Sequence, residues 1–150
     1  MKYKLYFDGG CRGGKAKAAW ILEDSGGNPI AKCTKDVIGE GTNNIAEWDA
    51  VWSGIQYVVT ELSDKEIELK IVGDSQLVIY QLIGKYQCKK PELQVYHQKC
   101  LDLLAKITWI AEWVPRNENT KANALCDGSK GGGKKRQPRP TGTEDWLGEC

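Results

Sequence analysis

The stretch TNNIAEWDAVWSGIQYVVTEL, residues 42–62, decides the fold, because its periodicity differs from that of the segments before and after it. Its large apolar residues recur at intervals of three and four: Ile45, Trp48, Trp52, Ile55, Val59 and Leu62. This spacing is typical of one apolar face of a helix of about five turns. Alternating segments precede and follow it, so the sequence predicts a helix inserted into a series of strands.

Three strands are predicted before this helix. KYKLYFDG, residues 2–9, alternates apolar and polar side chains and stops at a glycine pair. AAWILED (18–24) and IAKCTKDVI (30–38) flank the turn SGGNP, which is typical of a β-hairpin. The three segments together predict an antiparallel meander.

Helices and strands alternate after residue 62. EIELKIVGD (66–74) predicts a fourth strand, and SQLVIYQLIG (75–84) a short helix that ends at a glycine. PELQVYHQKCLDLLAKI (91–107) predicts a longer helix with a favourable first-turn proline, and TWIAEWV (108–114) a fifth strand. VPRNENTKANALCD (114–127) opens a last helix. We therefore expect an α/β domain with a mixed sheet and helices on both faces.

The composition indicates one globular domain. The chain has 150 residues, of which 41% are hydrophobic and 27% charged, and this is enough for one full core. Residues 1–128 are predicted to form the domain, and residues 129–150, rich in glycine, proline and bases, a tail. With a net charge of +1, a nucleic-acid-binding protein would have to concentrate its positive charge locally.

The cysteines and the lack of long apolar runs bear on the compartment. The six cysteines are scattered without a zinc-ligand spacing, which is typical of thiols in a reducing environment. No apolar run reaches the length of a signal-peptide core or a membrane span. We expect a cytoplasmic monomer with no membrane partner.

Three carboxylates stand at positions where active sites collect. Asp8 and Asp74 end the first and fourth predicted strands, and Glu47 lies in the first turns of the long helix. If those two strands are neighbours, the three acids converge, and a divalent cation such as Mg²⁺ would hold them together. Two such ions are the standard device for phosphodiester hydrolysis.

Each carboxylate also has an ordinary structural interpretation. Asp8 before two glycines is typical of a turn, and Glu47 of a favourable charge near a helix N-terminus. Asp74 is equally compatible with an N-cap. Alone, these interpretations are competitive or better, but the joint occurrence of all three favours a shared site.

Four segments in order resemble the signature segments of the type 1 ribonuclease H family, and the similarity spans essentially Tyr3 to Cys126. They are YFDGGCRGG (6–14), GTNNIAEWDAV (41–51), IVGDSQLVIYQL (71–82) and VPRNENTKANAL (114–125). The resemblance implies a ribonuclease H-like fold with strand order 3-2-1-4-5 and cleavage of the RNA strand of RNA/DNA hybrids. It also implies Mg²⁺ or Mn²⁺ as cofactor, with two ions when substrate is bound.

By this resemblance, Asp8, Glu47 and Asp74 match the first three metal-ligand carboxylates of the family. The fourth family carboxylate falls on Asn123, whose amide oxygen still ligates a hard cation but without a charge. We expect a weaker hold on one ion and a preference for Mn²⁺. The alternatives are a hybrid-binding module with reduced or lost catalysis, or another nuclease of the same fold.

The resemblance also assigns a substrate groove. The glycine-rich turn would approach the RNA ribose, Thr42 would bind a DNA phosphate, and three amides would reach base edges in the minor groove. These positions are Gly9, Gly10, Cys11, Arg12, Gly13, Thr42, Asn43, Asn44 and Gln76. Arg116 is left between two roles, contacting a phosphate or pairing with an acid. Glu118 is the nearest replacement for a loop histidine that some relatives use near product release.

One family feature is missing from the sequence. Some relatives carry a long basic helix and loop between the second and third helices, whereas only the short segment 84–90 stands there in this chain. We therefore expect no basic protrusion. His97, the one histidine, is distant in sequence from every motif and is expected at the surface or in packing.

Overall fold

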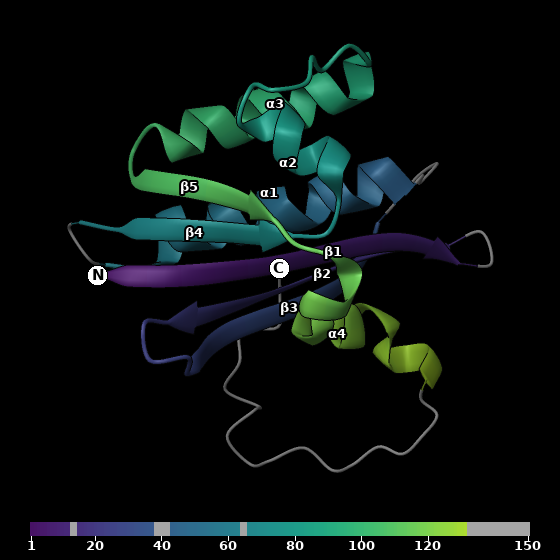
Figure 1. The fold of residues 1–150 in the computed structure, drawn as a ribbon, viewed down its shortest axis with the longest axis horizontal. Coiled ribbons are helices and arrows are strands. Elements are labelled where there is room, and N and C mark those ends of the chain that lie inside the picture. Colours follow the sequence, from purple (N-terminus) through teal and green to yellow (C-terminus); the bar gives the residue numbers. More distant parts are fainter. Residues whose placement is uncertain (13–14, 38–42, 64–65, 132–150) are drawn as a thin grey trace.

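The computed structural model describes residues 1–12, 15–37, 43–63 and 66–131 (Figure 1). The elements are β1 (Lys2–Arg12), β2 (Lys15–Asp24), β3 (Pro29–Val37), α1 (Asn43–Glu61), β4 (Glu68–Gly73), α2 (Gln76–Leu82), α3 (Pro91–Leu104), β5 (Thr108–Trp113), the 3-10 turn η1 (Arg116–Glu118) and α4 (Thr120–Gly131). Two predicted substrate residues, Gly13 and Thr42, lie outside the described residues, as do the side chains of Cys11 and Arg12 and most of the predicted tail.

The five strands form one mixed sheet in the order β3-β2-β1-β4-β5. β1 pairs antiparallel with β2, and β2 with β3, so the predicted meander is confirmed. β4 lies parallel to β1 on its other side, and β5 lies parallel to β4. The expected strand order is therefore confirmed, with the first and fourth strands as neighbours.

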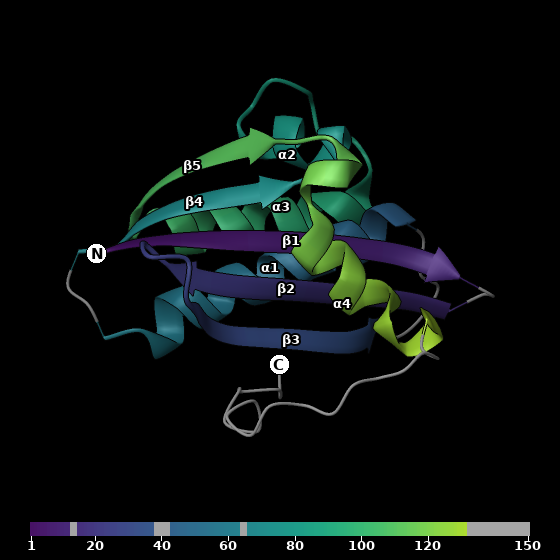
Figure 2. The ribbon, with the colours of Figure 1, turned by 60° about the horizontal axis from the view of Figure 1, so that its bottom comes forward.

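Helices cover both faces of the sheet, as expected. α1, α2 and α3 lie behind the sheet in Figure 2, while α4 crosses in front of β1 and β2. α2 and α3 are joined by residues 83–90, which form no helix, so the basic protrusion is absent as predicted. Among the described residues, no helix combines the length and the apolar character needed to cross a membrane.

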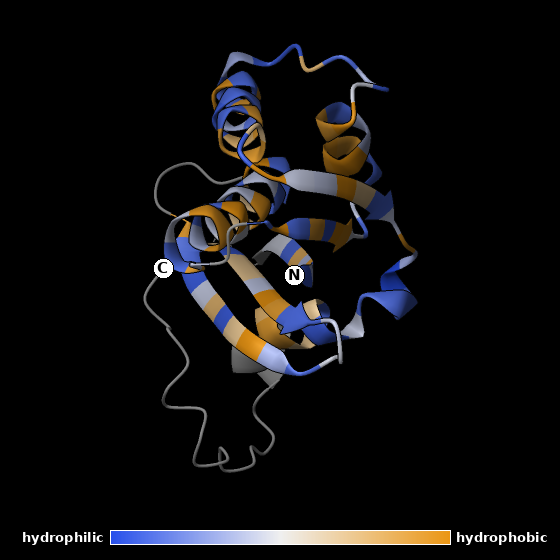
Figure 3. Ribbon diagram, turned by 90° about the vertical axis from the view of Figure 1, so that its left-hand side faces the viewer, coloured by the Kyte–Doolittle hydropathy of each residue, from blue (hydrophilic) through white to orange (hydrophobic). Residues whose placement is uncertain are grey.

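The core lies between the sheet and the helices α1 to α3. The strands carry alternating hydrophobic and hydrophilic bands in Figure 3, as period-two patterns require. The largest fully buried side chains include Trp20, Trp48, Phe7, Leu5 and Ile55. Each such side chain contributes about 1.5–3 kcal/mol by leaving water. His97 packs against Trp48 with ring centroids 5.5 Å apart, which confirms the packing role expected for it.

β1 is longer than the sequence indicates. The glycine pair was expected to end this strand after Asp8, but β1 continues to Arg12 because β2 continues to pair with it through Arg12↔Lys15. The pairing with β4, in contrast, ends at Phe7↔Gly73. Asp8 therefore still pairs with β2, whereas on the side of β4 it lies just beyond the last pair.

Gly9 lets β1 approach the first helix closely. A Cβ atom at Gly9 would lie 2.3 Å from the backbone carbon of Ala46 and 2.5 Å from the backbone nitrogen of Glu47. Real Cβ atoms do not reach such distances, so only glycine permits this contact. At Gly10, by contrast, an added Cβ would meet nothing within 4 Å. The first glycine thus serves the fold, and the second faces open space.

The cysteines only partly follow the sequence prediction. Cys88, Cys100 and Cys126 are not disulfide-bonded, as expected. Cys33, on β3, is disulfide-bonded, so the expectation of thiols throughout is wrong. The scattered spacing of the cysteines gave no sign of this, because a disulfide depends on distance in the fold and not in the sequence.

Candidate active site

Three carboxylates meet where the β1–β4 ladder ends. Asp8 and Asp74 are the residues directly after the last pair, Phe7↔Gly73, so parallel pairing places them side by side. α1 brings Glu47 to them, and one ligand oxygen from each of the three acids lies within 4.8 Å of the others. Asp8 is only 1% exposed. The convergence that the sequence predicted is therefore present.

Asp74 is not a helix cap. Ser75 is the N-cap of α2, and its hydroxyl accepts a hydrogen bond from the backbone N–H of Val78 at 3.2 Å. The N-cap interpretation of Asp74 is thus wrong, because the next residue already fills that role. The indole Nε1–H of Trp113 donates to the backbone carbonyl of Asp74 at 3.2 Å. Nothing in the sequence pattern predicts this contact of Trp113 with the site.

Glu47 is held by the strand and not by the helix N-terminus. It is the fifth residue of α1, and the first turn of that helix contains no acid. Its Oε1 accepts a hydrogen bond from the backbone N–H of Gly9 at 3.2 Å. Burial, followed by the charges of Asp8 and Asp74, raises the pKa of Glu47 to about 9. The helix-charge interpretation is therefore wrong, and the free site holds a proton at neutral pH.

Arg116 is the cation that faces these acids. Its Nη1 atom lies 3.7 Å from Oδ2 of Asp74 and 4.0 Å from Oδ1 of Asp8, while its side chain stays 57% exposed. Of the two roles left open by the sequence, the structure shows the pairing with acids. The charge partly offsets their repulsion and lowers the pKa of Glu47 against the stronger effects that raise it.

Asn123 lies one turn into α4, and its amide has a defined orientation. Its Nδ2 donates to the backbone carbonyl of Arg116 at 2.8 Å, which leaves Oδ1 as the acceptor. Oδ1 is shielded from solvent and has no hydrogen-bond donor among the described residues, and the same holds for Oδ2 of Asp74. Buried oxygens without hydrogen-bond donors are suited to bind a hard cation such as Mg²⁺, which prefers oxygen ligands. The donor set therefore fits a divalent metal ion.

The predicted substrate residues lie on the elements around the acids. Asn43 is exposed and Asn44 half-buried at the start of α1, and Gln76 is exposed as the first residue of α2, two positions after Asp74. Gly10 adjoins open space on β1. Glu118 is exposed on η1. All of these stay predictions as substrate contacts.

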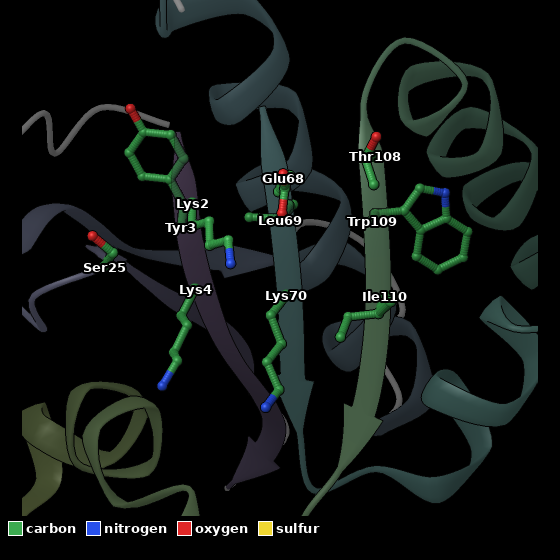
Figure 4. Close-up of a pocket in the computed structure, with 10 residues that line it drawn as sticks. All are labelled: Lys2, Tyr3, Lys4, Ser25, Glu68, Leu69, Lys70, Thr108, Trp109 and Ile110. Carbon is green, nitrogen blue, oxygen red and sulfur yellow. The ribbon is translucent and has the colours of Figure 1, made fainter. Parts of the chain in front are cut away.

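A depression of about 360 Å³ lies elsewhere on the sheet (Figure 4). Its lining includes Lys2, Lys4, Lys70 and Ile110, from β1, β4 and β5. Lys4 and Lys70 precede the acids of their strands by four residues, about 13 Å at the usual rise of a strand. The depression is therefore separate from the carboxylate cluster.

The raised pKa of Glu47 predicts how the stability of the metal-free protein depends on pH. The unfolded chain loses the Glu47 proton near pH 4.5 and the folded chain near pH 9. Between these values the folded state binds more protons, so the free energy of unfolding falls as pH rises. The slope for one group is at most about 1.4 kcal/mol per pH unit. We expect Glu47→Gln to remove this slope in denaturation experiments with EDTA.

Glu68, an exposed acid on β4, provides the matched control for that measurement. Glu68→Gln is expected to keep the slope of the unmodified protein. A slope that survives in Glu47→Gln would show that another group takes up the proton.

Comparisons with known proteins agree with this geometry. Residues 6–129 match the family model described as reverse transcriptase-like. The chain is 37% identical over 125 residues to ribonuclease HI of Halobacterium salinarum, covering 81% of this chain and 61% of that protein. The crystal structure of RNase H1 from the same archaeon has a TM-score of 0.75 at 33% identity, covering 87% of this chain and 98% of that one.

Two further solved structures are similar. The N-terminal RNase H domain of Rv2228c from Mycobacterium tuberculosis has a TM-score of 0.78 at 30% identity, covering 86% of this chain and 93% of that one. LC11-RNase H1 in complex with an RNA/DNA hybrid has a TM-score of 0.70 at 28% identity, covering 84% and 94%.

The chain spans 61% of the archaeal relative and 35% of the longer mycobacterial proteins that it also matches. Over that span, the matched model covers most of the chain, and solved relatives at 30% identity or more are covered almost completely. The acids at the end of the β1–β4 ladder and the sheet order agree with these matches, and the chain belongs to the ribonuclease H family.

Proposed function

We propose that this protein is a metal-dependent endoribonuclease that hydrolyses the RNA strand of RNA/DNA hybrids and leaves 5′-phosphate and 3′-hydroxyl ends. The observation that carries the proposal is the convergence of Asp8, Glu47 and Asp74 within 4.8 Å. The choice of substrate is supported by the similar LC11-RNase H1, whose structure is a complex with an RNA/DNA hybrid.

The acids are assigned to two divalent cations, Mg²⁺ or Mn²⁺. Bound cations polarise the scissile phosphate and lower the pKa of the attacking water. By this proposal Asp8 would serve both ions, Glu47 and Asp74 would each help to hold one, and Asn123 would complete the second site through its Oδ1. To act as a ligand, Glu47 must give up the proton that the free site retains. Metal binding is therefore expected to release a proton and to strengthen as pH rises.

A cation, a glycine and three amide side chains around the acids are assigned to substrate binding. Arg116 faces the acids in the free chain at distances of 3.7 and 4.0 Å, too long for strong hydrogen bonds. With the acids held by cations, its exposed guanidinium would be available to a phosphate oxygen of the substrate. Gly10, with open space beside it, allows the RNA backbone to approach. Asn43, Asn44 and Gln76 are assigned to the minor groove, where the 2′-hydroxyl marks the RNA strand.

The test is cleavage of an end-labelled RNA/DNA hybrid in Mg²⁺ and, separately, in Mn²⁺. We expect internal cuts in the RNA strand, more rapid in Mn²⁺, and no cleavage of the DNA strand or of duplex DNA. Absence of cleavage in both metals, with correctly folded protein, would overturn the proposal. The cytoplasmic location, the monomeric state and the division at residue 128 stay predictions.

Asn123→Asp is expected to raise the rate in Mg²⁺ by about tenfold or more, because a charged oxygen ligand replaces a neutral one. The same change removes the Nδ2 donor to the carbonyl of Arg116. The metal-free variant should therefore be less stable, by about 1 kcal/mol or more. Rates in both metals and melting temperatures in EDTA check the two effects.

Asn117→Asp adds the same charge on the exposed turn η1 and is the matched control. It should leave the rate in Mg²⁺ nearly unchanged. If the unmodified protein binds hybrid without cutting it and Asn123→Asp alone cuts, the chain is a hybrid-binding module, the alternative that the amide at this position favours.

A further inference from the structure

Asn119 is buried in a segment that is otherwise exposed. The residue is 0% exposed, whereas the residues of η1 before it and Thr120 and Lys121 after it lie at the surface. By residue type and position, directly before α4, Asn119 would ordinarily be interpreted as an N-cap of that helix. Its Nδ2 instead donates a hydrogen bond to the backbone carbonyl of Phe7, at 2.9 Å and 112 positions away. A buried amide directed at a distant strand needs a different explanation from a cap.

The partner of Asn119 is the strand residue next to the first acid. Phe7 forms the last pair between β1 and β4, and Asp8 follows it directly. The hydrogen bond therefore attaches the segment after β5 to β1 at the point where the carboxylates emerge.

The backbone of Asn119 connects Arg116 with Asn123, the residue predicted as the fourth ligand. Its N–H donates to the carbonyl of Arg116 at 3.0 Å, and its carbonyl accepts from the N–H of Asn123 at 3.0 Å. The side chain of Asn123 donates to the same carbonyl of Arg116 at 2.8 Å. Arg116, Asn119 and Asn123 thus form one hydrogen-bonded turn, and Asn119 is the member of it that bonds to the sheet through its side chain.

Other contacts already hold α4 to the sheet. Lys121 forms an ion pair with the buried Glu23 of β2, and Ala122 and Cys126 are buried. These contacts are directed at the helix and not at the turn before it. Removal of the Asn119 amide should therefore leave α4 packed and release the turn that carries Arg116.

We propose that Asn119 is a positioning residue, which holds the turn before α4 and thereby sets the guanidinium of Arg116 against Asp8 and Asp74 through its hydrogen bond to Phe7. This inference rests on the proposed function. It adds to that function a residue that acts through its neighbours and contacts neither metal nor substrate. A double-mutant cycle separates such a role from a general effect on stability.

The cycle compares Asn119→Ala, Arg116→Ala and the double variant on a labelled RNA/DNA hybrid. Asn119→Ala is expected to lower kcat by about 10- to 100-fold, because the turn is displaced from the acids. In the Arg116→Ala background the same change should cost no more than about threefold, because the group that it positions is gone. An equal loss in both backgrounds would overturn the proposal.

Lys121→Met is the control for stability, since it weakens the attachment of the same helix at a different point. It should lower the melting temperature and change kcat by no more than about twofold at a temperature where all variants are folded. If it lowers kcat as much as Asn119→Ala does, Asn119 acts only through the stability of the fold.

A measurement without substrate keeps the two proposals distinct. The ¹⁵N relaxation of the Arg116 side chain is expected to show more motion in Asn119→Ala than in the unmodified protein or in Lys121→Met. If Asn119→Ala does not fold, Asn119→Asp keeps the size and removes the donor. If no variant cleaves hybrid, the proposed function fails, while the relaxation data still decide the positioning role. Unchanged motion of Arg116 would overturn it.

Discussion

Asp8→Asn is expected to reduce hydrolysis of the RNA strand by about 10³-fold or more in either metal. Asp8 is the carboxylate assigned to both cations, and loss of one strong electrostatic contribution to the transition state costs about 10²- to 10³-fold. The effect should exceed that of any single change at a substrate-binding position, because it weakens both metal sites at once. Single-turnover rates on a labelled hybrid give the measurement.

The same Asp8→Asn variant should be more stable than the unmodified protein in the absence of metal, although its rate is lower. Asp8 raises the pKa of Glu47 through like-charge repulsion. Removal of the Asp8 charge therefore lowers the electrostatic cost of folding the metal-free chain. We expect Asp8→Asn to melt at a higher temperature than the unmodified protein in EDTA. An inactive but more stable protein excludes unfolding as the cause of the lost rate.

Asp102→Asn, on the exposed surface of α3, is the matched control. It removes the same charge away from the cluster and should leave the rate unchanged. Residual activity of Asp8→Asn close to that of Asp102→Asn would show that the three acids are not the catalytic site.

Gly9→Ala is expected to have the largest effect on stability, about 1–3 kcal/mol or more. The added methyl would lie 2.3–2.5 Å from backbone atoms of Ala46 and Glu47, and a backbone yields less readily than a side chain. α1 must therefore move away from β1. Because Glu47 accepts its hydrogen bond from the N–H of Gly9, the acid moves too, and the rate should fall by about 10²-fold.

Gly10→Ala is the natural control, since it adds the same methyl one residue later where nothing lies within 4 Å. Its stability should stay within about 0.5 kcal/mol of the unmodified protein. A loss of rate in this variant would then report on the approach of the RNA backbone. Equal denaturation midpoints for the two variants would show that the close contact between β1 and α1 is not rigid.

Local patterns in the sequence were sufficient for the elements and their order. The period-two segments became strands, and the apolar spacing of residues 45–62 became α1, because both patterns report directly on which side chains a regular element buries. Family resemblance supplied the strand order, and with it the meeting of Asp8 and Asp74. The convergence of the site was therefore predictable.

Properties that depend on partners distant in the sequence could not be predicted from local patterns. The end of β1 is set by the length of β2, which a glycine pair within β1 does not reveal. Asn119 is of a residue type typical of helix N-caps, yet its side chain donates its hydrogen bond to a residue 112 positions away. The proton on Glu47 depends on burial and on two acids from other elements. Ser75 took the cap expected of Asp74, which no propensity distinguishes.

The unequal length of β1 on its two sides divides this strand into parts under different constraints. Residues up to Phe7 are fixed between β2 and β4, whereas the pairs from Gly10↔Lys17 to Arg12↔Lys15 involve β2 alone. Substitutions at residues 10–12 are expected to leave the central ladder and the acids in place, because no pair with β4 involves these residues. In evolution or in engineering, this end of β1 is therefore expected to tolerate substitution more readily than the part up to Phe7, because it is constrained by one neighbouring strand and not by two.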